Sequence, residues 1–203
     1  MVVKSKSNPL KKIRNLLKDQ KGILSASDLS HLGIPRTYLA ILEKNGEIQR
    51  ISRGIYITAG NATDEMAVLQ IRFRGAIFSH ETALYLLDLT DRTPLYYSVT
   101  VPSGSNATTL KASGAKVYFV QRDLYPLGLT ALKSPYGNNI KTFNMERTIC
   151  DVVRSRNQMD VQFVNQALKK YVEQRGRNLN QLWAYAARFG IQKTMREYIE
   201  VLL

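Results

Sequence analysis

Two short helical segments, separated by a glycine and followed by a pair of strands, constrain this chain more than any other stretch of its sequence. Ser25 is a preferred N-cap residue, and Asp28 stands three residues later, as in a capping box. Gly33 ends the first segment, and Pro35 suits the first position of a second helix that runs to Lys44. Two short helices joined by a glycine-containing turn are typical of a helix-turn-helix.

A tight β-hairpin is predicted directly after these helices, over residues 47–58. Isoleucine recurs through this segment, and Ser52-Arg53-Gly54 supplies a turn between its two halves. Upstream, apolar residues at helical spacing predict a further helix from Pro9 to Gln20. A hairpin after a helix-turn-helix is a wing, so we expect residues 1–60 to form a winged helix-turn-helix domain that binds double-stranded DNA.

The charge of the chain favours a polyanionic partner. The sequence has 29 basic and 16 acidic residues, which give a net charge of +13 at pH 7. Residues 1–60 hold 11 of the basic and 4 of the acidic residues, a net charge of +7. Over half of the excess positive charge therefore lies in the expected DNA-binding domain.

The second helix of the pair has the face that a recognition helix needs. At about 100° per residue, one side carries Leu39 and Leu42, and the opposite side carries small or basic residues that permit close approach to base edges. Tyr38 falls toward the inner side, beside the outer stripe. Lysines of the first helix can contact phosphates, and arginines of the wing can reach phosphates or the minor groove. The expected DNA contacts are Lys11, Lys12 and Lys18 on the first helix; Arg36, Thr37, Tyr38, Ala40 and Lys44 on the recognition helix; and Arg50, Ser52 and Arg53 on the wing.

A different class of function is open to the same residues. Winged helices also serve as protein-interaction modules without specific DNA binding, and basic residues can form a merely solvated face. The placement of the charge favours DNA over this alternative.

Residues 61–203 are expected to form a larger, mixed α/β domain that ends in a helical bundle, so the fold class of the whole chain is α+β. The polar stretch from Asn61 to Asp64 marks the boundary. Helices are predicted from there to Phe73, from Ser79 and from Asn144, and strands over 96–101, 116–121 and 140–143. Three amphipathic helices follow, with apolar stripes that start at Val161, Leu179 and Ile191, the last reaching Leu202.

Tests for an active site give no positive support. With two histidines, His31 and His80, and one cysteine, Cys150, the chain lacks the ligands of a Cys/His zinc site. No nucleotide-binding or nucleophile-elbow motif is present. We interpret Glu146 and Asp151 as a helix cap and ion-pair partners, although a nuclease that uses them stays an open alternative. We expect no enzyme activity, metal ion or cofactor.

The ends and the apolar runs of the sequence predict a soluble cytoplasmic protein. The N-terminal residues lack the apolar stretch of a signal peptide, and residues 1–7 are expected to be a flexible basic arm. No run approaches the ~18 apolar residues of a membrane span.

Three motifs, in this order, resemble those of a known family. They are Arg50–Tyr56 at the end of the predicted wing, Phe78–Leu84, and Met145–Asp151. Their order and separation are similar, through most of the chain, to those of the AbiEi antitoxins of type IV toxin–antitoxin systems. We interpret the third motif as a structural hallmark rather than a catalytic site.

The resemblance implies functions that composition and spacing do not show. A protein of this kind would repress its own operon by binding inverted repeats in its promoter. Residues 61–203 would be an antitoxin domain that antagonises a nucleotidyltransferase-like toxin, without necessarily forming a stable complex, in phage defence by abortive infection. Because no heptad pattern demands a dimer, we expect a monomer in solution that meets a second copy on DNA.

Overall fold

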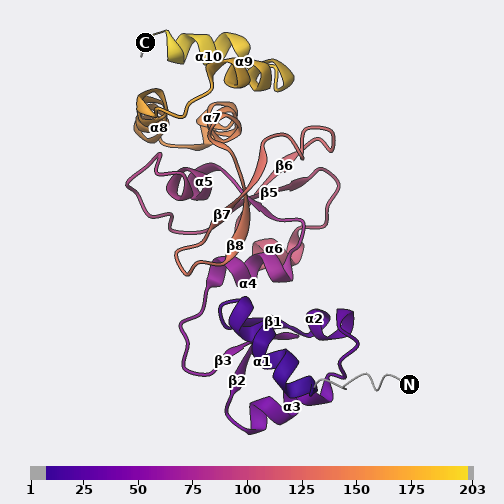
Figure 1. Cartoon of the computed structure of the whole chain (residues 1–203). Helices are drawn as coiled ribbons and strands as arrows, with labels where there is room; N and C mark the ends of the chain where they lie inside the picture. The colour runs from indigo at the N-terminus through magenta and orange to yellow at the C-terminus, as the bar shows by residue number, and fades with distance from the viewer. Residues whose placement is uncertain (1–7, 201–203) are drawn as a thin grey trace, which may run out of the picture. The chain divides into compact units, whose positions relative to one another are not determined.

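The computed structural model of the chain describes residues 8–200, which form a mixed α+β structure with two separate sheets (Figure 1). The described residues divide into two compact units. The N-terminal unit contains the residues up to Arg72 together with Lys133–Asn138, and the C-terminal unit contains Phe73–Leu132 and the residues from Asn139 onward. The predicted basic arm, residues 1–7, lies outside the described residues.

The N-terminal unit begins with a helix, a strand, two helices and a hairpin (Figure 1). Its elements are α1 (Pro9–Asp19), β1 (Ile23–Ser25), α2 (Ala26–His31), α3 (Thr37–Lys44), β2 (Ile48–Ser52), β3 (Ile55–Thr58) and α4 (Glu65–Arg72). The sheet has the order β1-β3-β2, and both pairings are antiparallel. The predicted pair of helices and the hairpin after them are thus present.

The local signals of this unit act as expected. The Ser25 hydroxyl accepts from the Asp28 N–H, and the Asp28 carboxylate accepts from the Ser25 N–H at 2.8 Å, so the predicted capping box is confirmed. The apolar faces of α1, α2 and α3 meet in one core. Its buried members are Ile13, Leu17, Leu24, Leu29, Ile34, Leu39, Leu42 and Ile48.

Two local expectations for this unit were wrong or incomplete. Helix α3 begins at Thr37 with Arg36 as its N-cap, so Pro35 precedes the helix and is exposed. Strand β1 was not predicted, because a strand of three residues is too short to show a period. It forms because Leu24 pairs with Tyr56 of β3 and is itself fully buried.

The N-terminal unit extends beyond residue 60, the predicted end of the DNA-binding domain. Asp64 is buried, and its Oδ1 accepts from the Ala67 N–H at 3.1 Å, which makes it a cap of α4, as predicted. Its Oδ2 accepts from the Ser134 hydroxyl and from Asn138 Nδ2. These bonds attach residues 134–138 to the start of α4, and no sequence pattern foretells a contact across that separation.

The C-terminal unit is built on a five-stranded mixed sheet with the order β6-β5-β4-β8-β7. Its elements are β4 (Ile77–Phe78), α5 (His80–Leu86), β5 (Ser98–Pro102), α6 (Thr108–Ala112), β6 (Lys116–Val120), β7 (Leu129–Lys133), β8 (Asn139–Phe143), α7 (Met145–Arg154), a 3-10 turn (Arg156–Gln158), α8 (Val161–Glu173), α9 (Leu179–Arg188) and α10 (Gln192–Ile199). Strand β4 pairs antiparallel with β5 and parallel with β8. Strands β4 and β7 and helix α6 were not predicted, since each is short or lies in a turn-rich segment.

The predicted terminal helices are present and pack against α7, which also packs against α5 (Figure 1). Their shared core includes Ile149, Val153, Leu168, Leu182 and Met195, all of them fully buried. The prediction that Val161 starts the buried stripe of α8 was wrong. Val161 is 62% exposed, and Phe163 and Val164 begin the buried face instead. Leu202, the end of the last predicted stripe, lies outside the described residues.

No helix within residues 8–200 is long and apolar enough to cross a bilayer.

Candidate nucleic-acid interface

The N-terminal unit presents a set of exposed cations with few acidic partners. Every Lys and Arg between residues 8 and 60 is exposed. Arg14 forms an ion pair with Glu47, in which Nε lies 2.7 Å from Oε2 and Nη2 lies 2.9 Å from Oε1. The hydrogen bond from Arg14 lowers the pKa of Glu47. Within the described range, no other Lys or Arg of residues 8–60 forms an ion pair, so these cations are available to an external anion.

Helix α3 turns a polar and small-residue face to solvent. Leu39 and Leu42 are buried, and Thr37, Ala40 and Lys44 are exposed, so the predicted orientation of this helix is confirmed. The exposed face has a further member, Ile41, whose exposed fraction is 44%. Tyr38 is half-buried and packs against the core of the unit.

Arg36 lies at the start of α3 and is exposed. Its Nη2 donates to the hydroxyl of Ser30 at 3.3 Å, across the turn that separates α2 from α3. A neutral acceptor leaves the charge of the guanidinium uncompensated, so Arg36 can still face a phosphate.

The hairpin of β2 and β3 places two arginines at the surface and one serine inside. Arg50 and Arg53 are exposed, and Arg50 Nε donates to the carbonyl oxygen of Ser52 at 3.3 Å. A β-bulge shifts the register between Arg50 and Ser52, and Gly54 closes the turn with a φ of +73°. The Ser52 hydroxyl is buried and has no hydrogen-bond partner. The expected contact of Ser52 with DNA therefore has no support in this conformation, because Ser52, which was expected in the turn, is the last residue of β2.

Helix α1 carries Lys11, Lys12 and Lys18, all exposed, opposite the buried Ile13 and Leu17. Sequence periodicity alone was enough to place them there.

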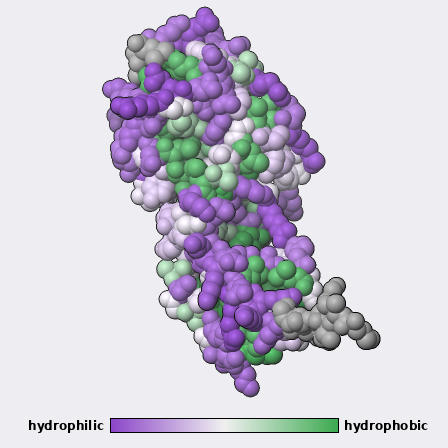
Figure 2. Space-filling view, in the orientation of Figure 1, coloured by the Kyte–Doolittle hydropathy of each residue, from purple (hydrophilic) through white to green (hydrophobic). Residues whose placement is uncertain are grey.

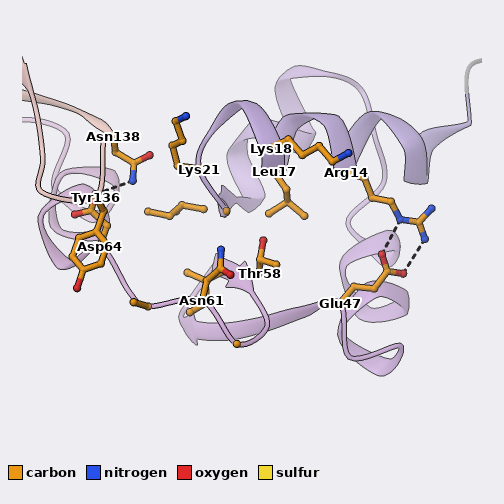
Figure 3. A pocket seen from close by; sticks show the side chains of 15 residues that line it. Arg14, Leu17, Lys18, Lys21, Glu47, Thr58, Asn61, Asp64, Tyr136 and Asn138 are labelled. Atoms are coloured by element: carbon orange, nitrogen blue, oxygen red, sulfur yellow. Dashed lines mark hydrogen bonds and ion pairs between the residues drawn. The ribbon is translucent and has the colours of Figure 1, made fainter.

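A pocket of about 810 Å³ lies in the N-terminal unit (Figure 3). Lys18 and Lys21 lie on its α1 side, and Asp64, Tyr136 and Asn138 lie at one end of it (Figure 3). Its lining includes Tyr136 and Asn138 of the β7–β8 turn, so the sequence of the first sixty residues could not have predicted it. Asp64 is already held by hydrogen bonds from Ser134 and Asn138.

The second motif of the resemblance, residues 78–84, forms part of the core of the C-terminal unit. His80 is fully buried, and its ring nitrogens lie within hydrogen-bond distance of the hydroxyls of Ser79 (3.0 Å) and Ser155 (3.1 Å). The imidazole stacks on Tyr118 with ring centroids 3.4 Å apart. Burial, followed by the nearby cations Arg154, Lys116 and Arg147, lowers the pKa of His80 well below its usual value. His80 is therefore a structural group of the interior with no access to a substrate.

The third motif, residues 145–151, also holds the interior together. Arg147 Nη1 donates to the carbonyl oxygens of Leu124 and Leu127 at 2.7 and 2.8 Å, and its Nε pairs with Asp151. Glu146 accepts the Asn178 N–H at 2.9 Å, so this carboxylate links α7 to the cap of α9. The interpretation of these acids as a cap and ion-pair partners fits these contacts better than the nuclease alternative, because both carboxylates are buried and engaged.

No group of three or more His, Cys, Asp or Glu side chains suited to a metal ion is found within residues 8–200. Cys150 is buried, and burial raises the pKa of its thiol, which leaves it unreactive.

The N-terminal unit thus combines exposed, unpaired cations with an exposed helix face and a basic hairpin. Residues 11–59 match the family model described as "Transcriptional regulator, AbiEi antitoxin". The match confirms the resemblance to the AbiEi antitoxins and associates this segment with antitoxins and DNA-binding regulators. It includes the motif Arg50–Tyr56 and ends before the other two motifs.

Two further comparisons add little to this family match. No curated protein matches the chain. Among solved structures, the RV2827C protein from Mycobacterium tuberculosis is similar over 91% of this chain and 75% of its own, with 13% sequence identity and a TM-score of 0.46. We draw no functional conclusion from a likeness of this size.

Proposed function

We propose that the N-terminal unit is a winged helix-turn-helix that binds operator DNA. The element order from α1 to β3 supports this reading, with α2 and α3 as the helix pair and the β2–β3 hairpin as the wing. The functional domain would then comprise residues 1–60, within the larger compact unit.

In this proposal α3 lies in a major groove, with Thr37, Ala40 and Lys44 toward the bases and Arg36 beside them. Arg50 and Arg53 extend from the hairpin to phosphates or to the minor groove. Lys11, Lys12 and Lys18 contact phosphates from α1. Tyr38 supports α3 from the core side, and Ser52 is left out because its hydroxyl is buried.

The biological role we propose is that of an autorepressor and antitoxin in the cytoplasm. The N-terminal domain would bind inverted repeats in the promoter of its own operon, with one monomer on each half-site. Residues 61–203 would antagonise a nucleotidyltransferase-like toxin, with or without direct contact, as part of abortive infection against phage. The family match supports the role of regulator and antitoxin. The inverted repeats, the kind of toxin and the role in abortive infection are proposals that go beyond that match.

One observation carries the DNA-binding proposal. The segment that matches the regulator family, residues 11–59, is also the segment in which the exposed cations have almost no acidic partners. If these positive charges served only solubility, ion pairs with acidic side chains would not interfere with their role, and we would expect more such pairs.

A mobility-shift titration on the protein's own upstream DNA tests the proposal. A scrambled duplex of the same composition is the control, and both are titrated at two salt concentrations. We expect tight binding to the upstream duplex in two steps, one for each half-site. Equal, salt-sensitive binding to both duplexes would show that the protein binds DNA only through its positive charge, without sequence specificity. Absence of binding to any duplex at low salt would favour a protein-interaction module.

A further inference from the structure

The recognition face of α3 contains an apolar side chain that none of the expected contacts includes. Ile41 is 44% exposed and lies one turn after Thr37 and three residues before Lys44, both of which are exposed. Residues three or four apart on a helix are neighbours, so Ile41 stands between these two polar groups. Ala40 adds a second exposed apolar group on the same face. Figure 2 shows a small hydrophobic area at the α3 end of the N-terminal unit, set among hydrophilic residues.

The chemistry of the major groove offers one apolar feature, the C5-methyl group of thymine. An exposed branched aliphatic side chain on a helix in that groove gains affinity by covering this methyl group. It cannot hydrogen-bond to the edges of guanine, cytosine or adenine. The exposed face of α3 is also poor in the side chains that read bases by paired hydrogen bonds, because Thr37, Ala40 and Ile41 occupy its centre.

We infer that Ile41 is a specificity-determining residue that recognises thymine methyl groups in the operator. The inference rests on the proposed function, since it requires α3 to lie in the major groove. It predicts that part of the sequence preference arises from burial of methyl groups, whereas the lysines of α1 contribute affinity for any sequence.

Replacement of thymine by uracil in the bound duplex tests this inference, because uracil lacks only the C5-methyl group and keeps its base pair. We expect the wild-type protein to bind the uracil duplex about fourfold more weakly for each methyl group that Ile41 covers, which corresponds to about 0.8 kcal/mol. We expect Ile41→Ala to bind the thymine duplex as weakly as the wild type binds the uracil duplex, and to discriminate little between the two.

Leu32→Ala is the matched control. Leu32 is 51% exposed, close to the value for Ile41, but it lies at the end of α2 rather than on α3. This variant should keep the full preference for thymine. Thermal unfolding of both variants checks that they fold, which their exposed positions favour.

Each remaining outcome overturns the inference in a different way. Equal binding of the wild type to the two duplexes would show that methyl groups are not read at all. A thymine preference that survives in Ile41→Ala would place the recognition on another residue. If the wild type did not prefer its upstream duplex over the scrambled one, the proposed function itself would be overturned. This result comes from the thymine duplexes alone, so it is distinguished from a failure of the inference about Ile41.

Discussion

Arg147 and Asp151 form an ion pair one turn apart on α7, with Nε 2.9 Å from Oδ2 and both side chains completely buried. The guanidinium also lies against two rings, with its central carbon 4.2 Å from the centroid of Phe143 and 4.5 Å from that of Phe189. Burial lowers the pKa of Arg147 and raises that of Asp151, so each charge depends on the other.

Removal of one partner from this pair should strongly destabilise the C-terminal unit. We expect Arg147→Met to lower the free energy of unfolding by about 3 kcal/mol, because the buried Asp151 would keep only its longer contact with Arg154, whose Nη2 lies 3.4 Å from Oδ1. Urea unfolding followed by the fluorescence of Trp183, the one tryptophan of the chain, reports on this unit.

The control for this experiment is Arg188→Ala, which removes an exposed pair with Asp123 and should cost less than about 1 kcal/mol. The double variant Arg147→Met/Asp151→Asn should lose less stability than the two single variants together. Additive losses would show that the two charges do not depend on each other.

The buried His80 should make the stability of the same unit depend on pH. Its lowered pKa keeps the folded state unprotonated, whereas the unfolded state gains a proton below about pH 6.5. Stability is therefore lost as the pH falls, by about 1.4 kcal/mol between pH 7.5 and 5.5. The free energy of unfolding of His80→Asn, measured at pH 7.5 and at pH 5.5, should lack this contribution to the pH dependence.

Asparagine suits this position because the φ of His80 is +48°, a region that asparagine tolerates better than most residues. The readout is the change of stability with pH, which stays meaningful even when the variant is less stable throughout. His31→Asn, which changes a histidine of the N-terminal unit, is the control for the exchange itself. An unchanged dependence in His80→Asn would contradict the assignment.

The lysines of α1 should contribute to DNA binding without regard to sequence. We expect Lys18→Ala to weaken binding to the upstream and the scrambled duplex alike, and to reduce the slope of log affinity against log salt by about 0.9. Mobility-shift titrations at several salt concentrations give this slope. Lys169→Ala, at an exposed lysine of α8, is the control; if Lys18→Ala matched it in affinity and slope, Lys18 would not contact phosphate.

The two neighbours Ser52 and Arg53 should differ sharply in their effect on binding. Arg53 is exposed at the hairpin turn, so Arg53→Ala should weaken binding and lower the salt slope by about one. The hydroxyl of Ser52 is buried and unpaired, so Ser52→Ala should leave affinity unchanged and should not lower the melting temperature. Loss of affinity in Ser52→Ala would mean that the hairpin changes conformation on DNA.

Much of the N-terminal unit could be predicted from its sequence because its contacts are local. The capping box of Ser25 and Asp28, the buried side of α3 and the hairpin all depend on residues close in sequence. The position of Ser52 differs from the expected turn, because Ser52 ends β2 after a bulge, and a bulge is a property of the paired strands and not of a single one. The exposure of Ile41 fits the same helical periodicity, although none of the expected DNA contacts includes this residue.

The C-terminal unit was harder to predict because its structure depends on distant partners. Strand β4 has only two residues, Ile77 and Phe78, and exists as a strand because β5 and β8 flank it. The sequence could not show that Arg147 would reach the carbonyl groups of Leu124 and Leu127. Burial of a charged side chain is set by such partners rather than by local pattern.

The pairing of β4 has a consequence for the order in which the chain takes shape during synthesis. Phe78 pairs with Thr142 of β8, 64 residues later, whereas every residue of the core of α1, α2 and α3 has been made once β3 ends at Thr58. Contacts between residues close in sequence form early, and contacts between residues distant in sequence form late, because the long loop between them must first be closed. The segment from α1 to β3 can therefore fold on the ribosome before β8, which pairs with the central strand β4 of the larger sheet, has been synthesised. The part that we propose to bind DNA then folds before the rest of the protein.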